Sequence, residues 1–228
     1  MFTASFLTGE PAMHSQHAPD SVRIAVSFGA FTATLTALLA KQRAEEPGTA
    51  ICLTEASFSE QVRGVKEGRY DLGFAVAPPS EAELQSEVLW HDEIAVAVPA
   101  LSPLLEFAEI TLEKAVQYPV VLWSAEHCEP LSGQVMQLLN SESPKLNVVD
   151  HAKSFELMAV LVAAGYGIGF AAKSRIDTAR KLGIVMRPLA GSPNDLSTYL
   201  LRAPSAPSSF TERLIERARK LDQSVSSH

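Results

Sequence analysis

Short apolar, β-rich runs alternate with stretches of helical periodicity along most of this sequence, and this alternation is the feature that most restricts its fold. The first run covers residues 22–26. Apolar residues then recur at helical spacing from Phe31 to Leu39, and Pro47-Gly48 is expected to end that helix. Such a rhythm is typical of α/β proteins, in which helices cover a largely parallel sheet. The chain is therefore predicted to be an α/β protein.

A second unit follows directly. A strand at 50–54 leads to Ser57, which precedes Glu60 by three residues in the spacing of a capping box and so predicts the start of a helix. The next run, 72–77, is almost entirely apolar, which predicts a parallel strand covered on both faces. Two complete βα units therefore precede Pro78-Pro79.

After the double proline the rhythm restarts. The expected elements are strands at 93–98, 120–123, 146–149, 168–171 and 196–201, and helices at 112–116, 131–139, 154–164 and 210–221. The glycines between 165 and 169 follow a helix and enter a strand, which is the reverse of the strand-to-helix order that holds a phosphate. These glycines are predicted to end the helix and turn the chain into the strand.

Composition restricts the possible partners. Lys and Arg number 19 against 26 Asp and Glu, which gives a formal net charge of −7 and makes the chain a poor match for nucleic acid. The longest apolar runs fall far short of the ~20 residues of a membrane helix. The apolar segment 1–8 has no preceding Lys or Arg and is shorter than the core of a secretory signal. We therefore expect a cytoplasmic protein without membrane contact.

Two further features point to no special chemistry. Residues 1–21 show no helical or strand periodicity and are expected to form a leader without regular structure. Cys52 and Cys128 are too few and too far apart for a disulfide framework, which fits a reducing compartment. A redox pair between these two cysteines is a minor alternative, because forming it would require a large motion.

No catalytic or metal-binding residue is assigned. The six histidines are scattered, and none belongs to an HExxH motif or a Cys/His cluster. His14 and His17 are interpreted as part of a solvated tail rather than as metal ligands. The sequence contains no GxSxG, P-loop or GxGxxG motif, so no cofactor is expected.

Candidate binding residues lie in the loops that follow the predicted strands. In α/β sheets, ligands bind beyond the carboxyl ends of the strands, where helix N-termini present free N–H groups. This rule selects Ser27, Phe28, Gly29, Ala30, Ser57, Phe58, Val76, Ala77, Trp123, Ser124 and Ser154. Hydroxyls at helix starts suit a carboxylate or another small polar ligand. For Ser57 and Ser154, simple capping of the next helix is the competing interpretation, and both roles can coexist.

Three strings of sequence resemble the effector-binding domain of LysR-type transcriptional regulators. They are Val22–Val26, Val65–Phe74 and Phe155–Phe170, and they occur in the order and spacing of that family. The resemblance covers about residues 22 to 224. It implies an α/β fold of two Rossmann-like subdomains joined by two crossover strands, similar to type 2 periplasmic binding proteins, with a small effector in the cleft between them.

The resemblance also implies domain boundaries. The first subdomain would comprise residues 22–92 plus 197–224 and the second residues 93–196, with crossings near 94–98 and near Leu196. Phe58 stands where many relatives carry a small hydroxyl residue, and Val76 where some carry a polar or basic group. These departures imply a bulkier, more apolar effector or a smaller cavity.

The function implied is the sensing of a small-molecule effector, an organic acid or an aromatic compound. The family pattern implies a homodimer in which the helix at 31–41 of one subunit lies beside a second-subdomain helix of the other. DNA would be bound only through a helix-turn-helix, for which residues 1–21 are too short. Three alternatives stay open: a solute-binding receptor, which would need a signal peptide or a lipobox cysteine; an orphan ligand-binding protein; and an enzyme, which would need clustered catalytic groups.

Overall fold

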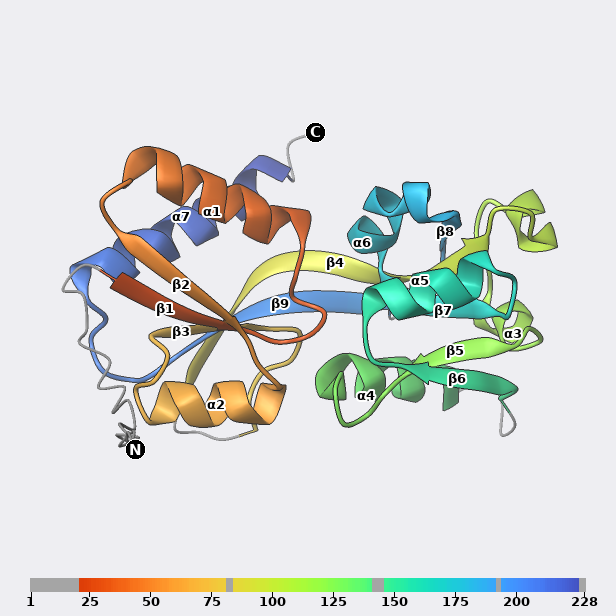
Figure 1. Cartoon of the computed structure of the whole chain (residues 1–228), viewed down its shortest axis with the longest axis horizontal. Helices are drawn as coiled ribbons and strands as arrows, with labels where there is room; N and C mark the ends of the chain where they lie inside the picture. Colours follow the sequence, from red (N-terminus) through yellow and green to blue (C-terminus); the bar gives the residue numbers. More distant parts are fainter. Residues whose placement is uncertain (1–20, 81–83, 141–145, 192–193, 226–228) are drawn as a thin grey trace, which may run out of the picture.

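The computed structural model describes residues 21–80, 84–140, 146–191 and 194–225, and these form two groups of elements joined by two long strands (Figure 1). The expected leader, 1–21, lies outside the described residues except for Ser21, which opens the first strand. His14 and His17 also lie outside them. The secondary structure confirms the α/β class.

The first group is built around a parallel three-stranded core. Strand β1 is central, with β2 on one side and β3 on the other, both parallel to it. The elements of this group are β1 (Ser21–Val26), α1 (Ala33–Glu45), β2 (Ala50–Glu55), α2 (Phe58–Lys66), β3 (Leu72–Ala75) and the last helix, α7 (Ser209–Val225). The two βα units expected before Pro78-Pro79 are therefore present.

The second group repeats this arrangement. Strand β5 lies between β6 and β7 and runs parallel to both. The elements are η1 (Pro103–Glu106), α3 (Leu112–Ala115), β5 (Val120–Trp123), α4 (Glu129–Asn140), β6 (Val148–Ala152), α5 (Phe155–Ala163), β7 (Ile168–Ala172), α6 (Lys173–Thr178), η2 (Arg180–Leu182) and β8 (Ile184–Pro188).

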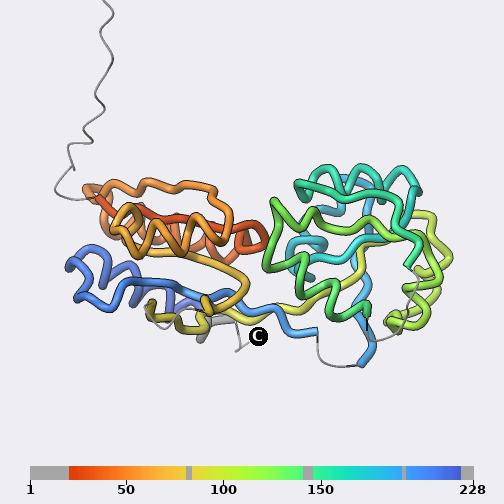
Figure 2. Tube along the Cα trace, turned by 90° about the horizontal axis from the view of Figure 1, so that it is seen from below, coloured from red at the N-terminus to blue at the C-terminus, as the bar shows by residue number. Residues whose placement is uncertain are grey.

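Strands β4 (Gln85–Pro99) and β9 (Asp195–Arg202) connect the two groups. From Gln85 to Glu93, β4 pairs with β9, and from Ile94 onward it pairs with β7 and β8. Because β9 also pairs with β3, the strands form one mixed sheet in the order β2-β1-β3-β9-β4-β7-β5-β6. Figure 2 shows both connecting strands running between the two groups. This curled mixed sheet agrees with the expected type 2 periplasmic-binding-protein-like fold.

Several boundaries differ from the sequence-based expectation. The strand expected at 72–77 ends at Ala75, and it is parallel to β1 but antiparallel to β9. The strand expected at 146–149 covers Val148–Ala152 instead. Phe31 precedes α1, because Thr32 caps that helix by accepting a hydrogen bond from the N–H of Leu35 at 3.3 Å.

The largest difference concerns β4, which was expected to start at Glu93 and starts at Gln85. Its first eight residues include exposed Gln85, Ser86 and His91, and the apolar stretch Val88–Trp90 is shorter than the run of about four to eight residues that predicts a buried strand. Pairing with β9 satisfies its backbone instead. Helix α6 and strand β8 were not predicted at all.

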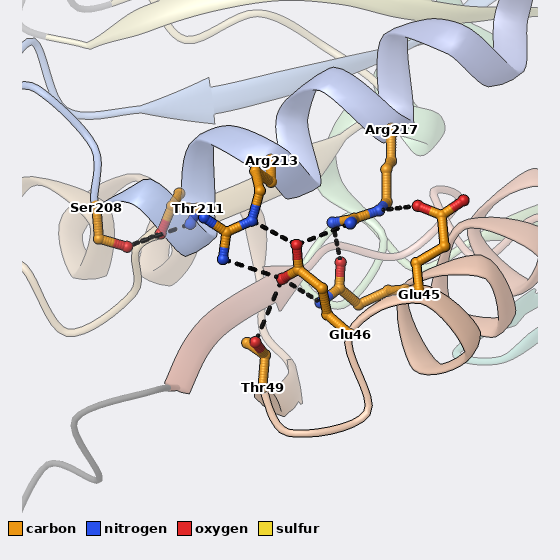
Figure 3. A network of polar contacts seen from close by, with 8 residues as sticks. Glu45, Glu46, Thr49, Ser208, Thr211, Arg213 and Arg217 are labelled. Atoms are coloured by element: carbon orange, nitrogen blue, oxygen red, sulfur yellow. Dashed lines mark hydrogen bonds and ion pairs between the residues drawn. The ribbon is translucent and has the colours of Figure 1, made fainter.

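Helix α7 returns the end of the chain to the first group. The indole N–H of Trp90 on β4 donates to the carbonyl of Ala218 at 3.1 Å, and the Trp90 ring stacks on Phe74 with centroids 5.5 Å apart. Figure 3 shows Arg213 and Arg217 of α7 directed at Glu46, beyond the end of α1.

Glu46 is the centre of that polar network. Arg213 and Arg217 both donate to its carboxylate, which also accepts from the Thr49 hydroxyl at 3.3 Å. These hydrogen bonds, from Arg213 first and Arg217 second, lower the pKa of the Glu46 carboxyl to about 2. The side chain is 17% exposed. The network therefore fixes α7 on the α1–β2 connection.

The turn after β1 is shaped by Gly29. The N–H of Ala30 donates to the carbonyl of Ser27 at 3.1 Å, and Gly29 between them has a φ of +93°. A Cβ at Gly29 would lie 3.2 Å from a methyl of Val76 and 3.6 Å from a methyl of Leu131. Three segments that are distant in the sequence therefore meet at this glycine.

We predict that Glu46→Gln makes the protein less stable near pH 7 and less sensitive to acid. Because the pKa is lowered in the folded state, the carboxylate stabilises the fold above its ordinary pKa of 4.5, and this contribution is lost as the pH falls from about 4.5 towards about 2. Thermal melts should show a loss of about 2–4 °C at pH 7, the shift expected for about 1 kcal/mol.

The difference between the Glu46→Gln variant and the wild type should shrink below pH 4. Glu109→Gln is the matched control, because Glu109 is exposed and makes no ion pair within the described ranges. An equal loss at pH 3 and pH 7 would contradict an electrostatic role for Glu46.

We predict opposite effects for alanine at two glycines. Gly29→Ala should destabilise by about 1–2 kcal/mol, since an L residue is strained at positive φ. Gly133→Ala should stabilise by up to ~1 kcal/mol, because Gly133 lies inside α4 and a Cβ there meets no atom within 4 Å. Urea midpoints measure both effects, and a Gly29→Ala variant as stable as the wild type would contradict the assignment of this turn.

Candidate functional site

Two aromatic side chains from opposite groups meet where the loops after β1 and β5 approach each other. The rings of Phe28 and Trp123 have centroids 4.9 Å apart and are tilted by 58°. Trp123 is 2% exposed, and its indole N–H donates to the carbonyl of Phe170 at 2.6 Å, which fixes the ring. The pair forms an apolar contact between the two halves of the sheet.

A second contact between the halves lies beside it. The side-chain amide of Gln134 on α4 donates to the carbonyl of Val76 at 2.6 Å. The Gln134 Oε1 atom is buried and has no hydrogen-bond partner in the described part of the chain. Val76 is itself buried against the position of Gly29. The loops after β1 and β3 thus meet helix α4 of the second group.

The structure therefore brings together four of the predicted residues, Phe28, Gly29, Val76 and Trp123. Ser27 and Ala30 are buried in the turn that carries Phe28, and the Ser27 N–H and hydroxyl both donate to the carbonyl of Phe74, at 3.0 and 3.5 Å. These two residues hold the loop in place. Ala77 follows Val76 and is half-buried.

The predicted serines at helix starts have partners within their own segments. The Ser57 hydroxyl accepts from the N–H of Glu60 at 3.3 Å, and the Ser154 hydroxyl accepts from the N–H of Leu157 at 3.2 Å. Both therefore cap a helix, as the competing interpretation held. The Ser124 hydroxyl lies 3.1 Å from Nδ1 of His127.

Phe58 lies apart from the aromatic pair. It lines a cavity of about 480 Å³ between α2 and the start of α4. The other residues lining this cavity are Ser59, Val62, Arg63, Lys66, Glu67, Pro79, Ser80 and Glu129. The structure thus gives Phe58 a cavity shared by both groups, but one that does not include Phe28 or Trp123.

Sequence reasoning missed a cation at this junction, Arg175 of α6. Its guanidinium carbon lies 4.5 Å from the ring centroid of Phe155 and 6.0 Å from that of Phe28. Nη1 donates to the carbonyl of Phe31 at 3.4 Å, and Nη2 lies 3.6 Å from a carboxylate oxygen of Glu156. The rule that ligands bind beyond the carboxyl ends of parallel strands could have found this residue, because Arg175 follows the carboxyl end of β7, which is parallel to β5.

Burial has the largest influence on the pKa of Arg175. Burial lowers the pKa of the Arg175 guanidinium from its ordinary value, and the carboxylates of Glu156 and Glu55 oppose that shift. Since arginine titrates far above neutral pH, the side chain stays charged. The junction therefore combines one cation with the aromatic faces of Phe28 and Phe155.

The cysteines do not supply a reactive group here. Cys128 is fully buried at the start of α4, and burial, aided by the charge of Glu55, raises the pKa of its thiol to about 11. Such a thiol is protonated at neutral pH and a poor nucleophile. Cys52 is exposed on β2. Among the described residues, no cluster of three or more His, Cys, Asp or Glu side chains is arranged to hold a metal ion.

Within the described ranges, no helix combines the length and the apolar character needed to cross a membrane.

Comparison with known proteins places the chain in a family of regulator domains. The family model described as LysR substrate binding domain matches residues 15–223. A probable transcriptional activator of the cat1 operon from Acinetobacter lwoffii is 26% identical over 148 residues, 64% of this chain and 49% of the relative. The chain spans about half the length of the curated relatives it matches.

Solved structures share the fold. The effector-binding domain of BenM with its effector benzoate superposes with a TM-score of 0.79 at 22% identity, covering 91% of this chain and 94% of that one. BenM is a regulator of Acinetobacter baylyi. The effector-binding domain of QuiR in complex with shikimate gives a TM-score of 0.71 at 16% identity, and the match covers 90% of this chain and 97% of the QuiR domain.

Family membership decides among the classes of function that the sequence left open. The matched family model covers far more than half of the chain, and the curated relatives are transcriptional regulators. The chain therefore belongs to the family of LysR substrate-binding domains, and it is the effector-binding domain of a transcriptional regulator rather than an enzyme.

Proposed function

We propose that this domain binds a small organic effector between the two halves of its sheet, at the junction of Phe28, Gly29, Val76 and Trp123. The observation that carries the proposal is the Phe28–Trp123 pair, which places aromatic faces from both halves in one contact. The binding residues extend to the neighbouring loops at Ser27, Ala30, Ala77 and Ser124. The helix starts at Ser57 and Ser154 are included as the polar ends of this site, and Phe58 contributes through the separate cavity that it lines beside α2.

The proposed boundaries of the two subdomains are 22–92 plus 197–224 and 93–196. The change of partner along β4 supports this division, because β4 pairs with β9 up to Glu93 and with β7 from Ile94. Ser174 and Lys173 at the start of α6 bind Asp92 and Glu93 at 2.5 and 2.8 Å. These contacts lie where β4 changes partner, and we propose this segment as the hinge between the subdomains.

Effector binding changes the relative placement of the subdomains. An effector shifts this equilibrium only if it binds one arrangement better than the other. An aromatic pair contributes about 0.5–1.5 kcal/mol beyond its buried area, and a neutral hydrogen bond such as Gln134 to Val76 about as much. A ligand with a micromolar dissociation constant supplies about 8 kcal/mol. Binding can therefore replace the contacts that now join the two halves.

The effector class we propose is an organic acid or an aromatic compound. The apolar faces of Phe28 and Trp123 suit a planar, apolar body, and Arg175 supplies positive charge close by. The effectors named for two structural relatives, benzoate for BenM and shikimate for QuiR, are both carboxylates. The effector of this domain belongs to that chemical range.

The domain acts as a homodimer, in which α1 of one subunit lies beside α5 of its partner. Helix α5 leaves Leu157 41% exposed and Val160 60% exposed, an apolar face that a partner would cover. Helix α1 exposes Ala33, Ala37 and Ala40, whose small side chains allow a close helix approach.

The domain senses its effector in the cytoplasm and does not itself bind DNA. The net charge of −7 supports this, since DNA binding depends on neutralising phosphates with Lys and Arg. DNA contact belongs to a helix-turn-helix, as the regulator names of the relatives suggest.

We expect benzoate or shikimate to raise the melting temperature of the domain. A ligand at 100 times its dissociation constant adds about 2.7 kcal/mol to stability. Phe28→Ala should abolish this shift, because it removes the aromatic face at the junction. Phe107→Ala is the matched control, since Phe107 is 39% exposed and packs on Lys114 at the start of the second group. A Phe28→Ala variant with the wild-type ligand response would place the effector elsewhere.

We expect Val160→Glu to convert the dimer into a monomer, because it buries a charge in the proposed interface. Val88→Glu is the control, a comparably exposed valine at 44% on β4. Sedimentation velocity measures the oligomeric state of the wild type and of both variants. This arrangement would be contradicted if the wild type were a monomer. It would also be contradicted if the Val160→Glu variant stayed a dimer, as the Val88→Glu control is expected to do.

A further inference from the structure

Arg175 brings a positive charge of the second subdomain to the aromatic loop of the first. It extends from α6, two residues after the Lys173–Glu93 ion pair on β4. Its guanidinium carbon lies 4.5 Å from the ring centroid of Phe155 in its own subdomain and 6.0 Å from that of Phe28 in the other, and Nη1 donates to the carbonyl of Phe31 across the junction. The side chain is 20% exposed.

The ion pair between Arg175 and Glu156 is weak. Glu156 lies 3.6 Å away and is 70% exposed, so water competes for its carboxylate. The Arg23–Asp71 pair provides a contrast within the same chain, since Nη2 of Arg23 lies 2.7 Å from Oδ1 of Asp71 and Nε also donates to that carboxylate. Glu55 also acts on Arg175, but at longer range.

Removing a guanidinium from water without a close carboxylate is costly. The aromatic faces on either side recover part of this cost through cation–π attraction, estimated at about 0.5–2 kcal/mol. A carboxylate bound in two-point geometry would recover more, because a guanidinium presents parallel N–H donors that match a carboxylate. The arrangement is therefore suited to an anion that arrives with the ligand.

We propose that Arg175 recognises the carboxylate of the effector, which displaces Glu156 and places its planar body against Phe28. This inference rests on the proposed function and specifies it: the effector is a monocarboxylate on a flat, apolar body, and the charge-recognising residue comes from α6. Because Arg175 now donates to Phe31 of the other subdomain, its capture by the ligand also changes a contact between subdomains.

A purely structural cation–π role for Arg175 predicts different behaviour. In that case its loss would lower stability but would not change the preference between a carboxylate and the corresponding carboxamide. It would also give Glu156 no influence on ligand affinity. These two differences determine the choice of variants and probes.

The experiment measures the affinities of benzoate, benzamide, shikimate and shikimamide by calorimetric titration. Wild type should prefer each acid over its amide. Arg175→Met should weaken acid binding by about ten- to hundredfold, the range of a charge-assisted hydrogen bond, and leave the amides within about twofold. Arg175→Lys should retain part of the preference. Glu156→Gln should tighten acid binding, because it removes the competing carboxylate.

Arg180→Met is the matched control, since Arg180 is 70% exposed and pairs with Asp177 away from the rings. It should bind all four probes as the wild type does. One outcome would overturn the role of Arg175 and leave the proposed site standing. In that outcome, Phe28→Ala abolishes acid binding, whereas Arg175→Met and Glu156→Gln leave it unchanged. Failure of the wild type to bind any of the four probes would overturn both.

Discussion

The exchange of partners along β4 is the constraint on which the rest of the structure depends. One continuous strand pairs with β9 as far as Glu93 and with β7 and β8 beyond it. The two halves of the sheet therefore share a backbone connection but keep separate parallel cores. The carboxyl ends of β1, β3, β5 and β7 then lead into loops that meet at one junction. The same pairing brings β9, and with it α7, back to the first half.

The first half is held together by ion pairs, whereas most of the contacts between the loops of the two halves are uncharged or long. Within the first half, Arg213 and Arg217 bind Glu46, and Arg23 binds Asp71. Between the loops of the two halves, the hydrogen bonds and ring contacts of the described residues include an aromatic pair, an amide hydrogen bond and a long hydrogen bond from Arg175, and Ser174 donates to Asp92 at 2.5 Å where the connecting strands cross from one half to the other. Such a difference suits a domain whose halves move as units, because a bound molecule then competes mainly with contacts between the halves and leaves the ion pairs of the first half in place.

Much of the fold follows from local patterns. Strand β5 has the predicted limits Val120–Trp123, and Ser57 and Ser154 cap the helices they were expected to start. Prediction failed for the first part of β4, where the apolar stretch Val88–Trp90 is only three residues long and is flanked by polar residues that pair with β9. At the candidate site, the strand-end rule found Phe28 and Trp123 but not Arg175. That rule was not extended to the strand Ile168–Ala172, whose following helix has only six residues.

The sequence by itself determined the α/β class, the order of most elements, the capped helix starts and the loops that follow the parallel strands, because each depends on residues close together in the chain. The tertiary structure decided which of those loops meet. Phe28 contacts Trp123, and Arg175 reaches Phe31, across 95 and 144 positions of sequence. Their meeting depends on how far β4 runs before it changes partner, and no local pattern of apolar residues specifies that length.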